Sequence, residues 1–131
     1  EVLAEKQIPL IVKAARKAVS EAELRWLDER PLTFASGDYL FVHAGIRPGV
    51  PLADQHPGNL LWIREPFLSF DGEHPAFIVH GHSARSDRPE FRRSRVGLDT
   101  GAYHSGKLTA LGLEGGRRWL LATNGPRGAA A

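Results

Sequence analysis

Cysteine and methionine are both absent from this 131-residue sequence. Without cysteine, the chain can form neither disulfide bonds nor metal sites built on thiolates. Because a natural chain starts with methionine, we expect further residues before Glu1. The sequence also lacks an apolar stretch long enough to span a membrane and the basic-then-apolar start of a signal peptide. We therefore expect a soluble, cytoplasmic protein with no membrane partner.

A strong excess of charge of either sign is lacking as well. The chain has 17 Lys and Arg residues against 15 Asp and Glu residues, which gives a formal net charge of +2. The most basic segment, residues 85–95, holds five arginines together with Asp87 and Glu90. A nucleic-acid patch here would bind with an affinity that falls steeply with salt, but Phe91 is the segment's only aromatic residue for stacking. We favour an exposed, salt-bridged loop and do not expect nucleic acid as a partner.

The first part of the chain is predicted to form two helices. In residues 8–19, apolar residues recur at helical spacing and basic residues occupy the other face. Pro9 suits a first helical position. Ser20 and Glu23 have the spacing of a capping box, so a second helix is expected from Ser20. It should end before Pro31, because the residue preceding a proline disfavours the helical conformation.

The rest of the chain is predicted to consist mainly of strands and loops. Short apolar runs bounded by turn residues predict strands, and Gly115-Gly116 predicts a hairpin turn. A helical turn capped by Asn59 is expected over residues 59–64, and residues 101–106 are expected to form a turn-rich loop. The predicted strands span residues 39–43, 76–80, 95–99, 107–113 and 117–123.

One predicted strand runs directly into His43 and another into the pair His80-Gly81-His82, which makes His43 and His82 candidate metal ligands. Their unbroken apolar runs predict strands buried on both faces. In open α/β sheets, ligand sites lie beyond the carboxyl ends of the strands, so both imidazoles are expected at one rim. Neutral imidazole binds Zn, Mn or Fe, although spacing alone slightly favours a pair of buried histidines with satisfied hydrogen bonds. Of the two histidines in His80-Gly81-His82, we expect His82 to be the ligand and His80 to support the site or the core.

Two further residues are candidates for substrate binding. Arg64 follows an apolar turn and precedes Glu65-Pro66, which suggests a fixed position, and a guanidinium can hold two phosphate oxygens at once. The alternative for Arg64 is an ordinary surface arginine paired with Glu65. Tyr103 lies in a glycine-flanked loop, where its phenol could contact a substrate oxygen or simply pack against its neighbours.

Four segments resemble, in order, the C-terminal half of bacterial calcineurin-like metallophosphatases. The branch is the one that contains serine/threonine protein phosphatases and diadenosine tetraphosphatases. Each segment alone is a weak signal, whereas four in order with compatible spacing make a strong match. The resemblance covers about residues 20–113. The segments are residues 40–46 (LFVHAGI), 60–65 (LLWIRE), 78–83 (IVHGHS) and 97–103 (GLDTGAY).

The resemblance implies an α/β fold, a partial calcineurin-like metallophosphatase β-sandwich flanked by helices, with the family's N-terminal half absent. Residues 1–123 would form the C-terminal portion of such a domain, with residues 1–30 helical and residues 31–123 mainly strands and loops. Residues 124–131 would be a frayed tail.

The resemblance also implies the chemistry of the site. His43 and His82 would be ligands of one metal ion, Arg64 would bind the phosphoryl oxygens, and Tyr103 would line the substrate groove. The family's complete site is dinuclear and holds divalent metal ions, for which we expect Mn, with Fe or Zn as alternatives. Such ions activate water for direct attack on the phosphate. The expected substrates are phosphoserine and phosphothreonine in phosphoprotein, or a nucleotide polyphosphate.

Three sequence blocks of the family's N-terminal half, GDxHG, GDxxDRG and GNHE, do not occur in this sequence. By the resemblance, they supply the remaining metal ligands and the histidine proposed as general acid, so no catalytic residue is assigned within these 131 residues. We therefore expect the parent protein to be a metallophosphoesterase, a hydrolase, and this chain alone to lack a complete site. The alternative is a non-catalytic binding or interaction remnant of the same fold.

Overall fold

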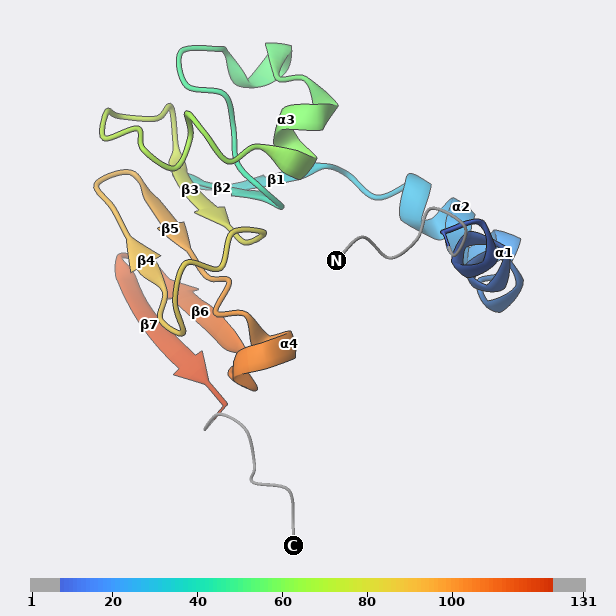
Figure 1. Cartoon of the computed structure of the whole chain (residues 1–131). Coiled ribbons are helices and arrows are strands. Elements are labelled where there is room, and N and C mark those ends of the chain that lie inside the picture. Colours follow the sequence, from blue (N-terminus) through green and yellow to red (C-terminus); the bar gives the residue numbers. More distant parts are fainter. Residues whose placement is uncertain (1–7, 124–131) are drawn as a thin grey trace, which may run out of the picture. The chain divides into compact units, whose positions relative to one another are not determined.

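The computed structural model of the chain describes residues 8–123 (Figure 1). The chain divides into two compact units, Glu1–Pro31 and Leu32–Ala131. The predicted frayed tail, residues 124–131, lies outside the described residues. Among the described residues, no helix is both long and apolar enough to cross a membrane.

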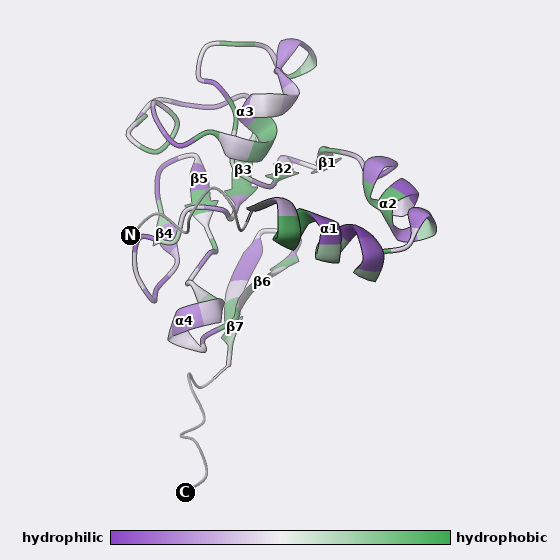
Figure 2. Cartoon of the chain, turned by 45° about the vertical axis from the view of Figure 1, so that its right-hand side comes forward, coloured by the Kyte–Doolittle hydropathy of each residue, from purple (hydrophilic) through white to green (hydrophobic). Residues whose placement is uncertain are grey.

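The first unit contains two helices, α1 (Ile8–Ala18) and α2 (Glu21–Asp28), which confirms the two predicted helices. Figure 2 shows apolar and polar residues as alternating green and purple bands along α1. This pattern is the one expected for an amphipathic helix. The large apolar side chains of these helices are nevertheless exposed. They are Leu10, Ile11, Val12, Leu24, Trp26 and Leu27.

Helix α2 begins with the capping box that the sequence predicts. The Ser20 hydroxyl oxygen accepts a hydrogen bond from the Glu23 backbone N–H (3.3 Å), and the Glu23 carboxylate accepts one from the Ser20 backbone N–H (2.7 Å). These bonds satisfy two of the N–H groups that a helix start leaves without partners. The hydrogen bond from the Ser20 backbone N–H contributes most to lowering the pKa of Glu23, and the hydrogen bond from the Ser20 hydroxyl contributes next. Desolvation raises this pKa by less than the two bonds lower it.

Replacing Ser20 with alanine should disrupt this cap. Without the hydroxyl, the Glu23 backbone N–H loses its acceptor and the Glu23 carboxylate loses one of its two donors. We therefore expect amide exchange in the first turn of α2 to accelerate and the pKa of Glu23 to rise toward its ordinary value. NMR-detected hydrogen exchange and pH titration measure both effects. Ser20→Thr keeps the hydroxyl and should change neither; an unchanged Glu23 titration in Ser20→Ala would contradict the capping assignment.

The second unit is built on a five-stranded sheet with the strand order β1-β2-β3-β5-β4. Strands β2, β3 and β5 are parallel, whereas β1 and β4 pair antiparallel to their neighbours at the two edges. Parallel pairing places the carboxyl ends of β2 and β3 at the same rim of the sheet, and each of these ends leads into a predicted site histidine. The strands are β1 (Thr33–Ser36), β2 (Tyr39–Val42), β3 (Phe77–His80), β4 (Glu90–Phe91) and β5 (Arg95–Gly97).

One face of this sheet carries the apolar core. Leu40 of β2 and Ile78 of β3 are register partners on this face, and both are buried. Helix α3 (Pro57–Trp62) and the segments beside it supply the opposing layer. Each large apolar side chain that becomes fully buried on this face contributes about 1.5–3 kcal/mol to folding. The core cluster comprises Leu40, Val42, Ala44, Ile46, Leu60, Ile63, Phe67, Leu68 and Ile78.

A separate two-stranded sheet contacts the opposite face. Strands β6 (Thr109–Glu114) and β7 (Arg117–Ala122) form the hairpin predicted around Gly115-Gly116. Arg118 extends from β7 to the first sheet, where its guanidinium lies 3.9 Å from the Phe77 ring centroid. Its Nε–H also donates a hydrogen bond to the Tyr39 hydroxyl (2.7 Å). The hairpin is therefore attached through cation–π and hydrogen-bond contacts.

The structure corrects several local predictions. Helix α3 begins at Pro57 rather than Asn59, because the His56 ring nitrogen Nδ1 accepts the Gly58 N–H (3.0 Å) and so acts as the cap. The predicted loop at residues 101–106 contains a short helix, α4 (Ala102–Ser105). No pattern in the sequence predicts β1, β4 or the 3-10 turn Leu52–Asp54.

Two burial predictions are also corrected. Strand β2 alternates between half-buried and buried residues, so it is not buried equally on both faces. In the arginine-rich segment, Arg95 is buried with 1% exposure, whereas the expectation was an exposed loop throughout. The prediction of a salt-bridged loop is confirmed for Arg92, which pairs with Glu90, and for Arg93, which pairs with Glu73.

Candidate functional site

The two predicted metal ligands lie side by side at the rim of the sheet. His43 follows β2, His82 lies two residues beyond β3, and the centroids of their rings are 5.0 Å apart. His43 is exposed and His82 is half-buried, so both rings can reach a ligand from solvent. We call these two residues the histidine pair. Parallel pairing of β2 with β3 explains why residues 39 positions apart in the sequence meet at one place.

The backbone around the histidine pair is tightly connected. The Gly81 N–H donates to the His43 carbonyl oxygen (2.9 Å), and the Ser83 N–H donates to the Gly81 carbonyl oxygen (2.7 Å). His82 has a φ angle of 62°, in the left-handed region that non-glycine residues rarely adopt. Backbone strain of this kind concentrates at functional sites, where the surrounding structure holds it in place.

Arg64 is fixed next to the histidine pair. Its guanidinium Nη1 donates a hydrogen bond to the Ser83 hydroxyl (3.1 Å), and Ser83 directly follows His82 in the chain. Glu65, the alternative partner considered for Arg64, instead accepts a hydrogen bond from the Ser69 backbone N–H (3.1 Å). The side chain of Arg64 is exposed, so its remaining N–H groups can bind an oxygen anion.

The electrostatic surroundings favour the neutral form of His82. Desolvation lowers the pKa of His82 most, and the positive charge of Arg64 and the neighbouring His43 lower it further. A hydrogen bond to the Trp62 backbone and the charge of Asp99 act in the opposite direction without reversing the shift. A metal ligand must be a neutral imidazole, so the lowered pKa suits this role.

Trp62 and Asp99 also lie at this rim, although neither was a candidate site residue from the sequence. The Trp62 ring is 71% exposed and meets the His82 ring edge-on at a centroid distance of 5.8 Å. The Asp99 side chain accepts the Gly101 N–H (2.9 Å) and lies close enough to His82 to affect its pKa. Both residues belong to segments chosen for the resemblance, and this was the signal that could have identified them.

Tyr103 is placed differently from Arg64. It lies in α4, is 95% exposed, and has the His104 ring as its aromatic neighbour at a centroid distance of 5.4 Å. The packed alternative for Tyr103 therefore does not apply. Its role in lining a substrate groove stays a prediction.

The histidine pair does not form a complete metal shell by itself. Two neutral imidazoles fit Zn, Mn or Fe as part of a shell, but a catalytic metal needs at least one further protein ligand beyond two. Within residues 8–123, the structure brings together no group of three or more His, Cys, Asp or Glu side chains that could hold a metal ion.

Behind the rim, on the core face, His80 and Arg95 form a buried polar contact. The Arg95 Nη1 is 3.2 Å from the His80 Nε2, and the His80 Nδ1 is 3.1 Å from the Gly81 carbonyl oxygen. Desolvation lowers the pKa of His80 to about 4; the charge of Arg95 adds to the effect, while the Gly81 hydrogen bond and Glu90 oppose it. His80 is thus a buried residue of the core face and not a member of the histidine pair.

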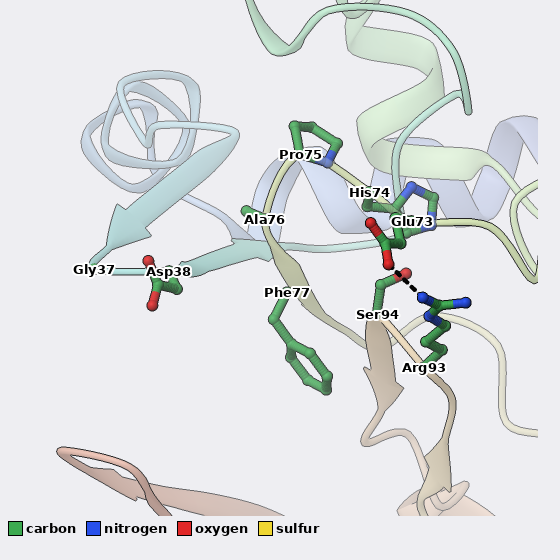
Figure 3. A pocket seen from close by; sticks show the side chains of 9 residues that line it. All are labelled: Gly37, Asp38, Glu73, His74, Pro75, Ala76, Phe77, Arg93 and Ser94. Carbon is green, nitrogen blue, oxygen red and sulfur yellow. Dashed lines mark hydrogen bonds and ion pairs between the residues drawn. The ribbon is translucent and has the colours of Figure 1, made fainter.

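A cavity of about 440 Å³ lies at the opposite end of the parallel strands (Figure 3). Its lining includes Asp38, Phe77 and Ser94, at or just before the amino ends of β2, β3 and β5. Figure 3 shows Glu73 and Arg93 joined by an ion pair at its edge. Ligands of open α/β sheets bind beyond the carboxyl ends of strands, so the histidine rim is the better candidate for chemistry.

No protein-family model matches this sequence, and no curated protein sequence matches it significantly. A solved structure does match: a crystal structure described as that of "a putative diadenosine tetraphosphatase" has a TM-score of 0.70 and 19% sequence identity. The match covers 89% of this chain and 62% of that chain, so this chain spans less than two-thirds of the neighbour's length. The expected partial α/β fold is confirmed, and it is similar to the fold of that neighbour.

Proposed function

We propose that this chain is part of a metal-dependent phosphoesterase, to which it contributes the histidine pair and Arg64. The observation that carries the proposal is the geometry of the rim, where two imidazoles with ring centroids 5.0 Å apart lie beside a fixed arginine. The combination of metal-ligating imidazoles with an oxygen-anion binder is suited to phosphate chemistry. The fold similarity to the neighbour described as "a putative diadenosine tetraphosphatase" supports the same reaction class.

In this proposal, Arg64 binds and orients the phosphoryl group. Its Nη1 is held by Ser83, and its other N–H groups can each donate to a phosphate oxygen. The histidine pair offers neutral nitrogen atoms to one ion, and the lowered pKa of His82 favours this state. A bound divalent ion, with Mn expected, would supply activated water and polarise the phosphate. The substrate is a phosphoprotein or a nucleotide polyphosphate, and the exposed side chain of Tyr103 in α4 is the residue we expect to line its groove.

The second candidate function is a non-catalytic binding domain. It is favoured by one observation: the histidine pair finds no third ligand among residues 8–123. In such a domain, Arg64 would still bind an anion, but added metal would produce no turnover. The two functions therefore differ in whether the rim recruits a metal ion for hydrolysis.

Hydrolysis of para-nitrophenyl phosphate, with and without Mn²⁺, is the experiment that tests the proposal. In a protein with a complete site, His82→Ala and His43→Ala should each abolish most metal-dependent turnover, because each removes a ligand. Arg64→Met should mainly weaken phosphate binding and slow the reaction. His56→Asn is a matched control: it changes another histidine and keeps a side chain that can cap α3.

Full activity in His82→Ala would refute the metal assignment. Turnover by these 131 residues alone that is lost in His43→Ala would show a complete site within the chain. Its absence, together with NMR line broadening of His43 and His82 by Mn²⁺, would indicate a partial site that needs further ligands. Absence of both turnover and broadening would favour the binding domain.

A further inference from the structure

Arg95 has the largest fully buried side chain among the described residues of the second unit. Apolar packing alone does not explain why a charged side chain occupies this position. It starts at the first residue of β5 and reaches three groups: the Leu68 carbonyl oxygen, the His80 ring and the Glu90 carboxylate. We propose that Arg95 is a positioning residue that fixes His82 and Arg64 relative to each other. The consequence for catalysis rests on the proposed function, whereas the positioning itself does not.

The first contact of Arg95 leads to Arg64. The Arg95 Nη2 donates to the Leu68 carbonyl oxygen at 2.6 Å, and the Leu68 N–H in turn donates to the Arg64 carbonyl oxygen at 2.9 Å. Phe67, between them in sequence, is fully buried and lies under the Arg95 guanidinium at 5.5 Å. The segment that carries Arg64 is thus fixed to Arg95 by the buried, charge-assisted hydrogen bond at the Leu68 carbonyl oxygen.

The second contact leads to His82. A guanidinium can only donate, so the His80 Nε2 must accept from Arg95 and its proton must reside on Nδ1. The Nδ1–H then donates to the Gly81 carbonyl oxygen, which also accepts the Ser83 N–H. These bonds orient the peptide group immediately before His82, whose φ of 62° requires support from its surroundings. Arg95 therefore sets the tautomer of His80, and through it the turn that presents His82.

The third contact balances the charge. The Glu90 carboxylate accepts from the Arg95 Nη1 at 3.2 Å, while the Arg95 Nε has no partner among the described residues. A buried ion pair adds little stability compared with apolar residues of the same volume. A lysine could not span these acceptors, because its donors all radiate from one nitrogen atom. Because its donors form a fork, arginine can connect the segment that carries Arg64 with the turn that carries His82.

The first test needs no variant. In the wild-type protein at neutral pH, ¹⁵N NMR of the imidazoles should show His80 as the Nδ1–H tautomer with an accepting Nε2. The Nε2–H tautomer or a charged imidazolium would overturn the proposal, because neither can accept from Arg95 while donating to Gly81.

The second test separates positioning from general stability. Arg95→Met should shift the backbone amide resonances of Arg64 and of residues 81–83, while those of the β6–β7 hairpin stay in place. Arg93→Met is the matched control, since Arg93 forms an exposed ion pair with Glu73, and it should move neither set. Unchanged rim resonances in a folded Arg95→Met protein would overturn the proposal.

A variant that breaks only one contact keeps the proposal testable if Arg95→Met does not fold. His80→Phe retains an aromatic ring and removes both imidazole hydrogen bonds, while the contact between Arg95 and Leu68 remains. The backbone amide resonances of residues 81–83 should shift and that of Arg64 should not. Equal shifts in both, or shifts in neither, would contradict the inference that Arg95 acts on His82 and on Arg64 through two separate contacts. In an active enzyme, Arg95→Met should weaken Mn²⁺ affinity about 10–100-fold. The NMR shifts in a protein that shows neither phosphatase activity nor broadening of His43 and His82 by Mn²⁺ would uphold the positioning and refute the proposed function.

Discussion

Replacing Phe67 with alanine should lower the free energy of unfolding of the second unit by about 3–5 kcal/mol. Phe67 is fully buried, and its ring contacts the His80 ring at a centroid distance of 4.9 Å. Gly45 shows how closely the chain packs around it, because a Cβ atom there would lie 2.3 Å from the Phe67 Cδ1. The surrounding atoms therefore cannot easily fill the cavity that alanine would leave.

Denaturant unfolding followed by the NMR signals of β3 and β5 measures this loss within the second unit. Phe34→Ala is the matched control, since Phe34 lies on the edge strand β1 and is 62% exposed. Removing its ring should cost less than about 1 kcal/mol, as is usual for surface positions. Equal losses for the two variants would contradict the burial pattern of this sheet.

The elements with strong local signals could be predicted from the sequence. The capping box at Ser20 and the Gly115-Gly116 turn are specified by neighbouring residues, so short-range rules were sufficient for α2 and for the β6–β7 hairpin. Strands β1 and β4 are short edge strands whose residues are stabilised by their pairing partners. That stabilisation is a long-range effect, and no periodicity in so few residues reveals it.

The approach of His43 and His82 could be predicted because parallel strands share a rim. Apolar runs followed at once by His43 and by His80-Gly81-His82 were sufficient for this inference, and the ring distance of 5.0 Å agrees with it. Their metal role stays a prediction. The buried state of Arg95 could not be predicted, because its acceptors on Leu68, His80 and Glu90 are 27, 15 and 5 residues away. In sequence, it looks like one more member of a basic loop.

The stability of the second unit should fall as the pH decreases from about 6.5 to about 4, and His80 should be the largest single cause. Desolvation lowers the pKa of His80 in the folded protein to about 4, against an ordinary value of 6.5. The unfolded chain therefore binds a proton at a pH where the folded protein does not, which favours unfolding. A shift of this size corresponds to about 3 kcal/mol, present in full above pH 6.5 and lost by about pH 4.

His80→Phe isolates this contribution, because the variant keeps an aromatic ring in the core and cannot titrate. The groups that face His80 are Arg95 on β5, Glu90 on β4 and His74 before β3, and all three remain in the variant. Desolvation also lowers the pKa of His74, so a weaker slope of the same sign should remain. Urea unfolding at a series of pH values measures the difference between the two proteins. If wild type and His80→Phe lose stability equally between pH 6.5 and 4, then the pKa of His80 is the same in the folded and the unfolded protein, and burial does not hold this imidazole in its neutral form.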